Sequence, residues 1–222
     1  MNEYHKIQTV FLRDPETKFK TLLVGQYADP AFEYLAKNRW VFTEKVDGTN
    51  IRVMIEPPQI SGDSFSITFG GKTDAALIPA TLNQRLQERF LTVKERKRLA
   101  EMFPDGACLY GEGYGAKIQK GGSNYRPDQD FVLFDVKVGD FWLERHNVED
   151  VAAKLGLDVA PIVGSGTLQE MIEMTKAGFP SEWSRGPNKS SFKAEGIVAR
   201  PACELKKRDG SRIITKIKRK DF

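Results

Sequence analysis

The sequence has few of the residues that cross-link a chain or anchor it in a membrane. Its 222 residues include two cysteines, Cys108 and Cys203, and two histidines, His5 and His146. Two cysteines are too few for a disulfide framework and are typical of a reducing compartment. No apolar run approaches the roughly 20 residues of a membrane helix, and the first residues contain no signal-peptide core. We therefore expect a soluble, cytoplasmic protein with no membrane partner.

The composition is that of a globular protein. Hydrophobic residues make up 40% of the chain and aromatic residues 10%. A chain of this size buries roughly 70% of its unfolded surface, so it can fold without a metal or disulfide. We find no internal repeat, low-complexity tract or linker. These features exclude collagen, coiled coil and disorder, and they predict a single domain over residues 1–222.

Positive charge gathers in two segments. Residues 206–222 carry eight cations and two anions, whereas the net charge of the whole chain is only +4. Residues 85–98 carry six cations and two anions, on a stretch that reads as helix. Such segments either bind a phosphate-rich partner or form a solvated, solubilising surface, and charge alone leaves both interpretations open.

Strands outnumber helices in the hydrophobic pattern. Strands are indicated by period-2 alternation or by short buried runs, over residues 41–42, 51–55, 65–69, 108–110, 131–138, 196–198 and 213–217. Helix starts are indicated at Asp29, Thr81, Thr92, Asn147 and Thr167, with stops at Gly156 and Gly178. Because the strands do not alternate strictly with helices, we predict an α+β fold with largely antiparallel sheets.

One lysine occupies a position suited to nucleophilic chemistry. Lys45 begins the segment Lys45-Val46-Asp47-Gly48, which follows one predicted strand and precedes another. A lysine at the end of a buried strand can lose hydration, which lowers the pKa of its amine and makes it a nucleophile. The following glycine permits close approach of the backbone. By itself this short pattern also arises in ordinary turns.

Further along the chain stand residues that would complement such a lysine. They are two carboxylates at strand ends, an aromatic ring in a strand and two lysines in the last strand, namely Glu112, Glu195, Phe134, Lys216 and Lys218. The period of a strand places Lys216 and Lys218 on one face. Together these groups meet the needs of binding and attacking a nucleoside triphosphate.

In order and spacing, these segments resemble the motifs of the covalent nucleotidyltransferases, and within them the ATP-dependent RNA ligases of the ligase 2 type. The corresponding segments are residues 45–48, 110–113, 134–135, 195–198 and 216–218. The resemblance implies a nucleotidyltransferase (ATP-grasp-like) domain of largely antiparallel sheets flanked by helices, without an OB domain. It covers residues 44–218, which is most of the chain.

The resemblance implies a reaction in three steps. Lys45 attacks the α-phosphate of ATP to form lysyl-AMP, AMP passes to a 5′-phosphate RNA end, and a 3′-hydroxyl then displaces AMP. Lys216 and Lys218 neutralise the α-phosphate as its charge develops. The implied cofactors are ATP and Mg²⁺, or Mn²⁺ in its place, with Glu195 as the protein ligand of the metal.

The family also implies which residues bind the nucleotide. Glu112 accepts from the ribose hydroxyls, Phe134 stacks on adenine and Glu44 lies near the adenine edge. Asn50, five residues after the nucleophile, favours an RNA ligase, because DNA ligases and capping enzymes have arginine there. Lys72 stands where the family usually has arginine, and it keeps the charge without the bidentate fork.

The chain ends four residues after Lys218, so we expect neither the C-terminal domain of many RNA ligases nor an OB domain. The expected partner is RNA with 5′-phosphate and 3′-hydroxyl ends, contacted by Lys117 and Lys120, and the sequence leaves nicked duplex, splinted and single-stranded RNA all open. A partner protein that supplies the missing domain is also compatible. The alternatives are a small DNA ligase, a capping-type guanylyltransferase and a non-catalytic RNA-end-binding module.

Overall fold

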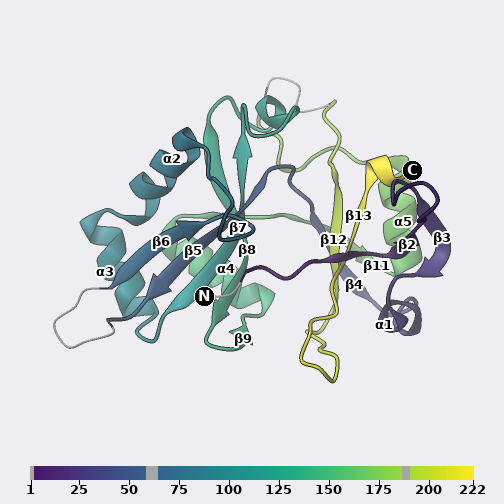
Figure 1. The fold of residues 1–222 in the computed structure, drawn as a ribbon, viewed down its shortest axis with the longest axis horizontal. Helices are drawn as coiled ribbons and strands as arrows, with labels where there is room; N and C mark the ends of the chain where they lie inside the picture. The colour runs from purple at the N-terminus through teal and green to yellow at the C-terminus, as the bar shows by residue number, and fades with distance from the viewer. Residues whose placement is uncertain (1–2, 59–64, 187–190) are drawn as a thin grey trace. The chain divides into compact units, whose positions relative to one another are not determined.

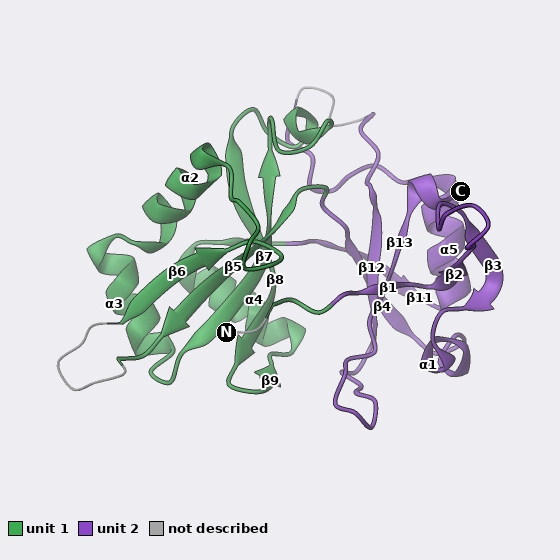
Figure 2. Ribbon diagram, in the orientation of Figure 1, with its two compact units in different colours: residues 1–5, 47–159 green, residues 6–46, 160–222 purple. Residues whose placement is uncertain are grey.

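The computed structural model describes residues 3–58, 65–186 and 191–222, and the chain divides into two compact units (Figures 1 and 2). Unit 1 comprises residues 1–5 and 47–159, and unit 2 comprises residues 6–46 and 160–222. Each unit has its own hydrophobic core. That residues 1–222 act as one domain stays a prediction, and the units are described separately.

Unit 1 is built on a six-stranded sheet of order β10-β8-β7-β5-β6, with β9 paired to β8. Its pairs are antiparallel except for β10 with β8. The strands are β5 (Thr49–Glu56), β6 (Ser66–Gly70), β7 (Ala107–Gly115), β8 (Gln129–Val138), β9 (Phe141–Trp142) and β10 (Asp158–Val159). The predicted α+β class with largely antiparallel sheets is confirmed.

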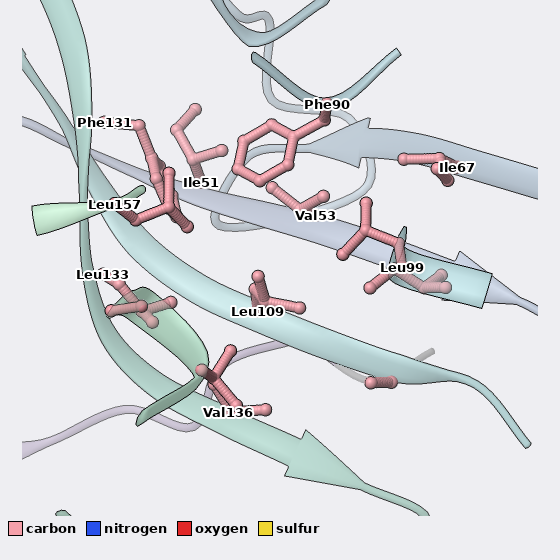
Figure 3. Packing of buried hydrophobic residues seen from close by; sticks show 14 of the residues in the cluster. Ile51, Val53, Ile67, Phe90, Leu99, Leu109, Phe131, Leu133, Val136 and Leu157 are labelled. Atoms are coloured by element: carbon pink, nitrogen blue, oxygen red, sulfur yellow. The ribbon is translucent and has the colours of Figure 1, made fainter. Parts of the chain in front are cut away.

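The core of unit 1 lies between one sheet face and its helices (Figure 3). The helices are α2 (Ala80–Phe90), α3 (Val93–Met102), α4 (Arg145–Leu155) and the short η1 (Gly122–Asn124). Alternate residues of β5 and every fourth residue of α2 are buried, as the two periods require, and these are Ile51, Val53, Ile55, Leu82, Leu86 and Phe90. The other sheet face carries, among others, the directly paired residues Asn50 with Glu112 and Arg52 with Tyr110.

Unit 2 is built on a five-stranded sheet of order β1-β13-β12-β4-β11, with a separate hairpin of β2 and β3. The strands are β1 (Gln8–Thr9), β2 (Phe11–Arg13), β3 (Leu22–Tyr27), β4 (Trp40–Glu44), β11 (Ile162–Gly166), β12 (Gly196–Pro201) and β13 (Thr215–Lys218). The helices are α1 (Pro30–Tyr34), α5 (Leu168–Ala177) and the short η2 (Arg219–Asp221). Trp40, Phe42 and Ile197 pack with Leu168 and Met171 of α5 in its core.

Three of the five predicted helix starts are confirmed. Asp29, Thr92 and Thr167 each accept a hydrogen bond from a first-turn backbone amide, and Thr167 forms a full capping box with Glu170. The predictions at Thr81 and Asn147 are wrong: α2 begins after Pro79 and α4 after Glu144. In each helix the first backbone hydrogen bonds reach back past the predicted cap, from Asn83 to the Pro79 carbonyl and from Val148 to the Glu144 carbonyl, and no side chain caps the first turn.

The C-terminal stops are confirmed. Gly156 and Gly178 follow the last residues of α4 and α5 with φ of 61° and 72°. Positive φ is easily adopted only by glycine, which explains both positions. Within the described ranges, no helix has the length and apolarity needed to span a membrane.

Candidate active site

In unit 2, three segments far apart in sequence bring Lys45, Glu195 and Lys218 together. Lys45 follows the last residue of β4, Glu195 precedes β12, and Lys218 ends β13. The backbone amide of Lys45 donates to the carbonyl of Gly196 at 3.0 Å, which extends the β4–β12 ladder to the nucleophile position. The Glu195 carboxylate then accepts from both ammonium groups, with Oε2 2.6 Å from Lys45 Nζ and Oε1 2.6 Å from Lys218 Nζ.

This cluster is shielded but open to a ligand. The exposed fractions of the side chains are 19% for Lys45, 12% for Glu195 and 22% for Lys218. Two cations share one carboxylate, so the three groups carry a net positive charge. Partly desolvated positive charge attracts phosphate more strongly than a fully hydrated lysine does.

Lys216 lies one strand period away from Lys218. In the β12–β13 ladder, Lys216 pairs with Val198 and Lys218 pairs with Gly196, while Ile217 between them is fully buried in the core. The side chains of Lys216 and Lys218 therefore leave the strand on the same face, as the alternation predicts. Lys216 is half-buried on that face.

Glu44 points the other way. It shares the core-facing side of β4 with Trp40 and Phe42 and is 2% exposed. Its carboxylate accepts from Ser181 Oγ at 2.5 Å and from the Trp183 amide at 3.1 Å. Burial raises the pKa of Glu44, and these hydrogen bonds only partly offset the effect. Sequence reasoning missed Ser181, which no local pattern distinguishes from other loop serines.

In unit 1, the Asp47–Gly48 turn lies tightly against β7. A Cβ at Gly48 would lie 2.2 Å from the carbonyl oxygen of Gly113 and 2.8 Å from Glu112 Cγ, so only glycine fits. The Asp47 amide donates to Tyr125 Oη at 3.1 Å, and Gln119 Nε2 donates to the Gly48 carbonyl at 2.9 Å. The turn is thereby tied to the loop that carries Lys117 and Lys120.

Asn50 and Glu112 stand opposite each other in the β5–β7 ladder. Directly paired residues of antiparallel strands project to the same face, which here is the face away from the helices. Asn50 Oδ1 is buried and accepts no hydrogen bond from the residues that the structure describes. Buried acceptors are normally satisfied, so this oxygen is suited to a donor on a ligand.

Phe134 occupies a bulge in β8. Leu133 pairs with Gly111 and Asp135 pairs with Tyr110, so Phe134 is the extra residue between the two pairs. Its half-buried ring lies edge-on to Tyr4, with centroids 5.1 Å apart. Tyr4 Oη also donates to the fully buried Asp135 at 2.6 Å. The sequence analysis did not anticipate Tyr4, because its partners lie more than a hundred residues away.

The remaining predicted binding residues are exposed lysines in loops. Lys72 follows β6, and Lys117 and Lys120 lie between β7 and η1. Lys117 has a φ of 67°, which is uncommon for a residue other than glycine. In unit 1, these lysines remain accessible to a phosphate partner.

The basic segment 85–98 is used mainly to hold unit 1 together. Arg89 binds Asp130 through two nitrogens, Arg96 donates to the Phe65 carbonyl at 2.9 Å, and Arg98 donates to the Lys154 carbonyl at 2.8 Å. Arg126, from outside the segment, also binds Asp130. Of the two interpretations open for this segment, the contacts favour a structural surface for its arginines.

Oxygen ligands for a metal are limited in the described part of the chain. No three His, Cys, Asp or Glu residues among those described come together as a metal-binding group. The predicted ligand Glu195 offers hard carboxylate oxygens, which suit Mg²⁺ or Mn²⁺. Both oxygens accept from ammonium groups, so a metal bound to Glu195 would replace one of these two contacts.

Comparison with known proteins places these residues in a family. The model of the RNA ligase family matches residues 38–218. A Naegleria gruberi RNA ligase solved with ATP and Mn has 18% identity and a TM-score of 0.62, covering 98% of this chain and 56% of that one. The same ligase with PPi has 20% identity and a TM-score of 0.58, covering 98% and 58%. The chain thus shares their fold and spans less than two thirds of their length.

Proposed function

Because the chain belongs to the RNA ligase family, we propose that it is an ATP-dependent RNA ligase that joins 5′-phosphate and 3′-hydroxyl ends through lysyl-AMP and adenylated RNA. The observation that carries this proposal is the arrangement of Lys45, Glu195 and Lys218, with nitrogen–oxygen distances of 2.6 Å. An amine, a carboxylate and a second cation are the groups that nucleotidyl transfer to lysine requires.

In the first step, Lys45 Nζ forms a bond to the α-phosphorus of ATP while the bond from that phosphorus to the bridging oxygen breaks. Pyrophosphate leaves with the electron pair of the broken bond. The ammonium of Lys45 must first lose a proton, which Glu195 Oε2 can accept at 2.6 Å, and the nitrogen loses a second proton to solvent once its bond to phosphorus has formed. Lys218 and Lys216 stay charged and stabilise the phosphate oxygens as negative charge develops.

The polar and aromatic residues of unit 1 are assigned to the nucleoside. Glu112 accepts from the ribose hydroxyls, the unpartnered Asn50 Oδ1 accepts from a second ligand donor, and Phe134 stacks on adenine. Lys72 contacts phosphate. Glu44 remains assigned to the adenine edge by the family resemblance, and it reaches a base only if it releases Ser181 and Trp183.

A divalent ion, Mg²⁺ or Mn²⁺, would be held by Glu195 together with phosphates and water. The ion supplies positive charge to the phosphates when bound.

The proposed partner is RNA with 5′-phosphate and 3′-hydroxyl ends, as a nicked duplex, on a splint or single-stranded. The exposed Lys117 and Lys120 offer phosphate contacts on a loop bonded to Gly48. The proposal also includes a partner protein that supplies a further domain for the sealing step. We also propose a cytoplasmic location, which the free cysteines Cys108 and Cys203 favour.

Incubation with labelled ATP and Mg²⁺, without RNA, tests the proposal. We expect a covalent AMP adduct that peptide mapping assigns to Lys45. Lys45→Ala should form none, whereas Lys94→Ala, which changes an exposed lysine in α3, should form it at the parental rate. The absence of any adduct would favour an RNA-end-binding module. In a parallel incubation with labelled GTP, preferential formation of a GMP adduct would indicate a capping enzyme. In a sealing assay, joining of nicked DNA but not of RNA would indicate a DNA ligase.

A further inference from the structure

The N-terminal segment of unit 2 runs beside the strand that carries Lys216 and Lys218. β1 pairs with β13 in parallel, Gln8 with Thr215 and Thr9 with Lys216, and the Val10 amide donates to the Lys216 carbonyl at 3.1 Å. β1 is the outermost strand of this sheet, next to β13. The segment leads directly into β2, which ends at Arg13.

Arg13 reaches a buried carboxylate just beyond β13. Its Nη2 donates to Asp221 Oδ1 at 2.7 Å, and the Asp221 side chain is only 2% exposed. Asp221 Oδ2 accepts from the backbone amide of Lys218 at 2.9 Å. One carboxylate therefore links the arginine to the backbone from which the Lys218 side chain departs.

The same turn also holds the backbone of Glu195. The Arg219 amide, inside η2, donates to the Glu195 carbonyl at 2.8 Å, one residue beyond the Gly196–Lys218 pair of the ladder. The two residues whose side chains flank Lys45 are thus bonded at the backbone to a single three-residue turn. The Asp221 carboxylate accepts from the amide of Lys218, the residue before the turn, through one oxygen and from Arg13 through the other.

We propose that Asp221, held by Arg13, is a positioning residue for adenylation of Lys45, acting through Lys218 and Glu195. This inference rests on the proposed function. A buried carboxylate is stabilised only by close, well-oriented donors, so Asp221 ties the position of the Lys218 backbone amide to that of Arg13. Displacement of a catalytic group by about 1 Å can lower a rate on the order of 10²-fold, so this geometry bears on the reaction.

Single-turnover formation of lysyl-AMP, at varied ATP and without RNA, tests the inference. For Asp221→Asn we expect a maximal rate about tenfold lower, with the half-saturating ATP concentration within about twofold of the parent, because the residue acts on placement and not on substrate binding. Arg13→Gln should show a similar loss, and the double variant should be little worse than either single one. Arg13→Lys should recover part of the rate.

The control is Asp209→Asn, which removes the same charge from an exposed turn bonded to Ser211 and should keep the parental rate. A purely structural role for Asp221 would lower the fraction of protein that reacts while the rate constant stays unchanged. That result, or parental rates in both folded variants, would overturn the inference. If Asp221→Asn does not fold, the lysyl-AMP rates of Arg13→Gln and Arg13→Lys test the inference instead, because Arg13 is partly exposed.

The two proposals fail in different ways. If the parental protein forms no adduct at Lys45, the proposed ligase function fails before Asp221 is tested. If the parental protein forms the adduct and the Asp221 and Arg13 variants form it equally fast, the function stands and only the positioning role is lost.

Discussion

Each unit places two or more cations around one carboxylate, yet the two clusters differ in kind. In unit 1, Asp130 is 2% exposed at its side chain and is bound by Arg89, Arg126 and Arg85. In unit 2, Glu195 is 12% exposed and is bound by Lys45 and Lys218. Guanidinium groups bind in fixed forks and stay protonated, whereas lysine binds as a point charge and can give up its proton. Arginine therefore suits the structural ion pairs of unit 1, whereas lysine suits the nucleophilic centre proposed in unit 2.

The first prediction makes the unit 2 cluster resemble that of unit 1. Lys45→Arg keeps the positive charge beside Glu195 but cannot supply a neutral amine, so adduct formation should fall to background. Thermal unfolding should stay close to that of the parent, because the ion pair is retained. Adduct formation is measured with labelled ATP and unfolding by circular dichroism. An arginine variant that forms the adduct would contradict both the assignment of the nucleophile and the comparison.

The second prediction concerns the other cations of unit 2. Lys218→Ala or Lys216→Ala removes charge from one face of β13, and the rate of lysyl-AMP formation should fall about 10²-fold. Arginine at either position should restore little, because its fork places the charge differently. The Lys206→Ala/Arg208→Ala double variant, which changes two exposed residues of the same basic segment, is the control for general charge and should keep the adenylation rate. Equal rates in all these variants would show that the strand has no catalytic part.

The third prediction tests the contribution of the Asp130 ion pairs to the stability of unit 1. Asp130→Asn leaves three arginines around a neutral side chain, and the free energy of unfolding should fall by about 3 kcal/mol. Chemical denaturation gives the change, with the exposed Asp140→Asn as a control that should lie near the parent. A small effect of Asp130→Asn would mean that the ion pairs of Asp130 contribute no more to stability than surface ion pairs do.

The pH dependence of the free energy of unfolding gives a second test of the Asp130 ion pairs. Burial of Asp130 raises its pKa, but the bonds from Arg89 and the Phe131 amide outweigh burial and hold the pKa below its usual value. A lowered pKa in the folded state means that this contribution is complete above the ordinary carboxyl pKa of 3.8 and is lost as pH falls toward the folded-state value. Asp130→Asn should therefore be less sensitive to acid over that range.

The smallest expected effect lies in the core of unit 2. Ser181→Ala removes a donor to the buried Glu44, and the free energy of unfolding should fall by about 1 kcal/mol at neutral pH. Because the folded-state pKa of Glu44 is raised, the folded protein holds this proton more firmly, and stability falls as pH rises above the usual carboxyl value. The loss in Ser181→Ala should be smaller in acid, where Glu44 is protonated.

Ser211→Ala is the matched control, because Ser211 donates to Asp209 at 2.6 Å on an exposed turn. Its change in stability should be close to zero at either pH, since water replaces the lost bond. If the two serine variants behave alike in denaturation, the Glu44 bonds contribute no more than surface bonds.

Much of the site follows from short-range patterns in the sequence. The strand period alone placed Lys216 and Lys218 on one face, and the Lys45–Gly48 segment marked a turn that admits only glycine at its last position. The motif order was enough for the family, which the match over residues 38–218 confirms. The strand face and the turn depend on residues within a few positions of each other, where local geometry leaves little freedom.

Only the tertiary structure decided which distant groups meet. Lys45 and Glu195 are 150 residues apart, and Arg13 and Asp221 are 208 residues apart, so no local period relates them. The same limit applies to the buried hydrogen bond between Ser181 and Glu44, which are 137 residues apart. Sequence period determines the face a residue occupies. The pairing of strands far apart in the chain determines what lies opposite it.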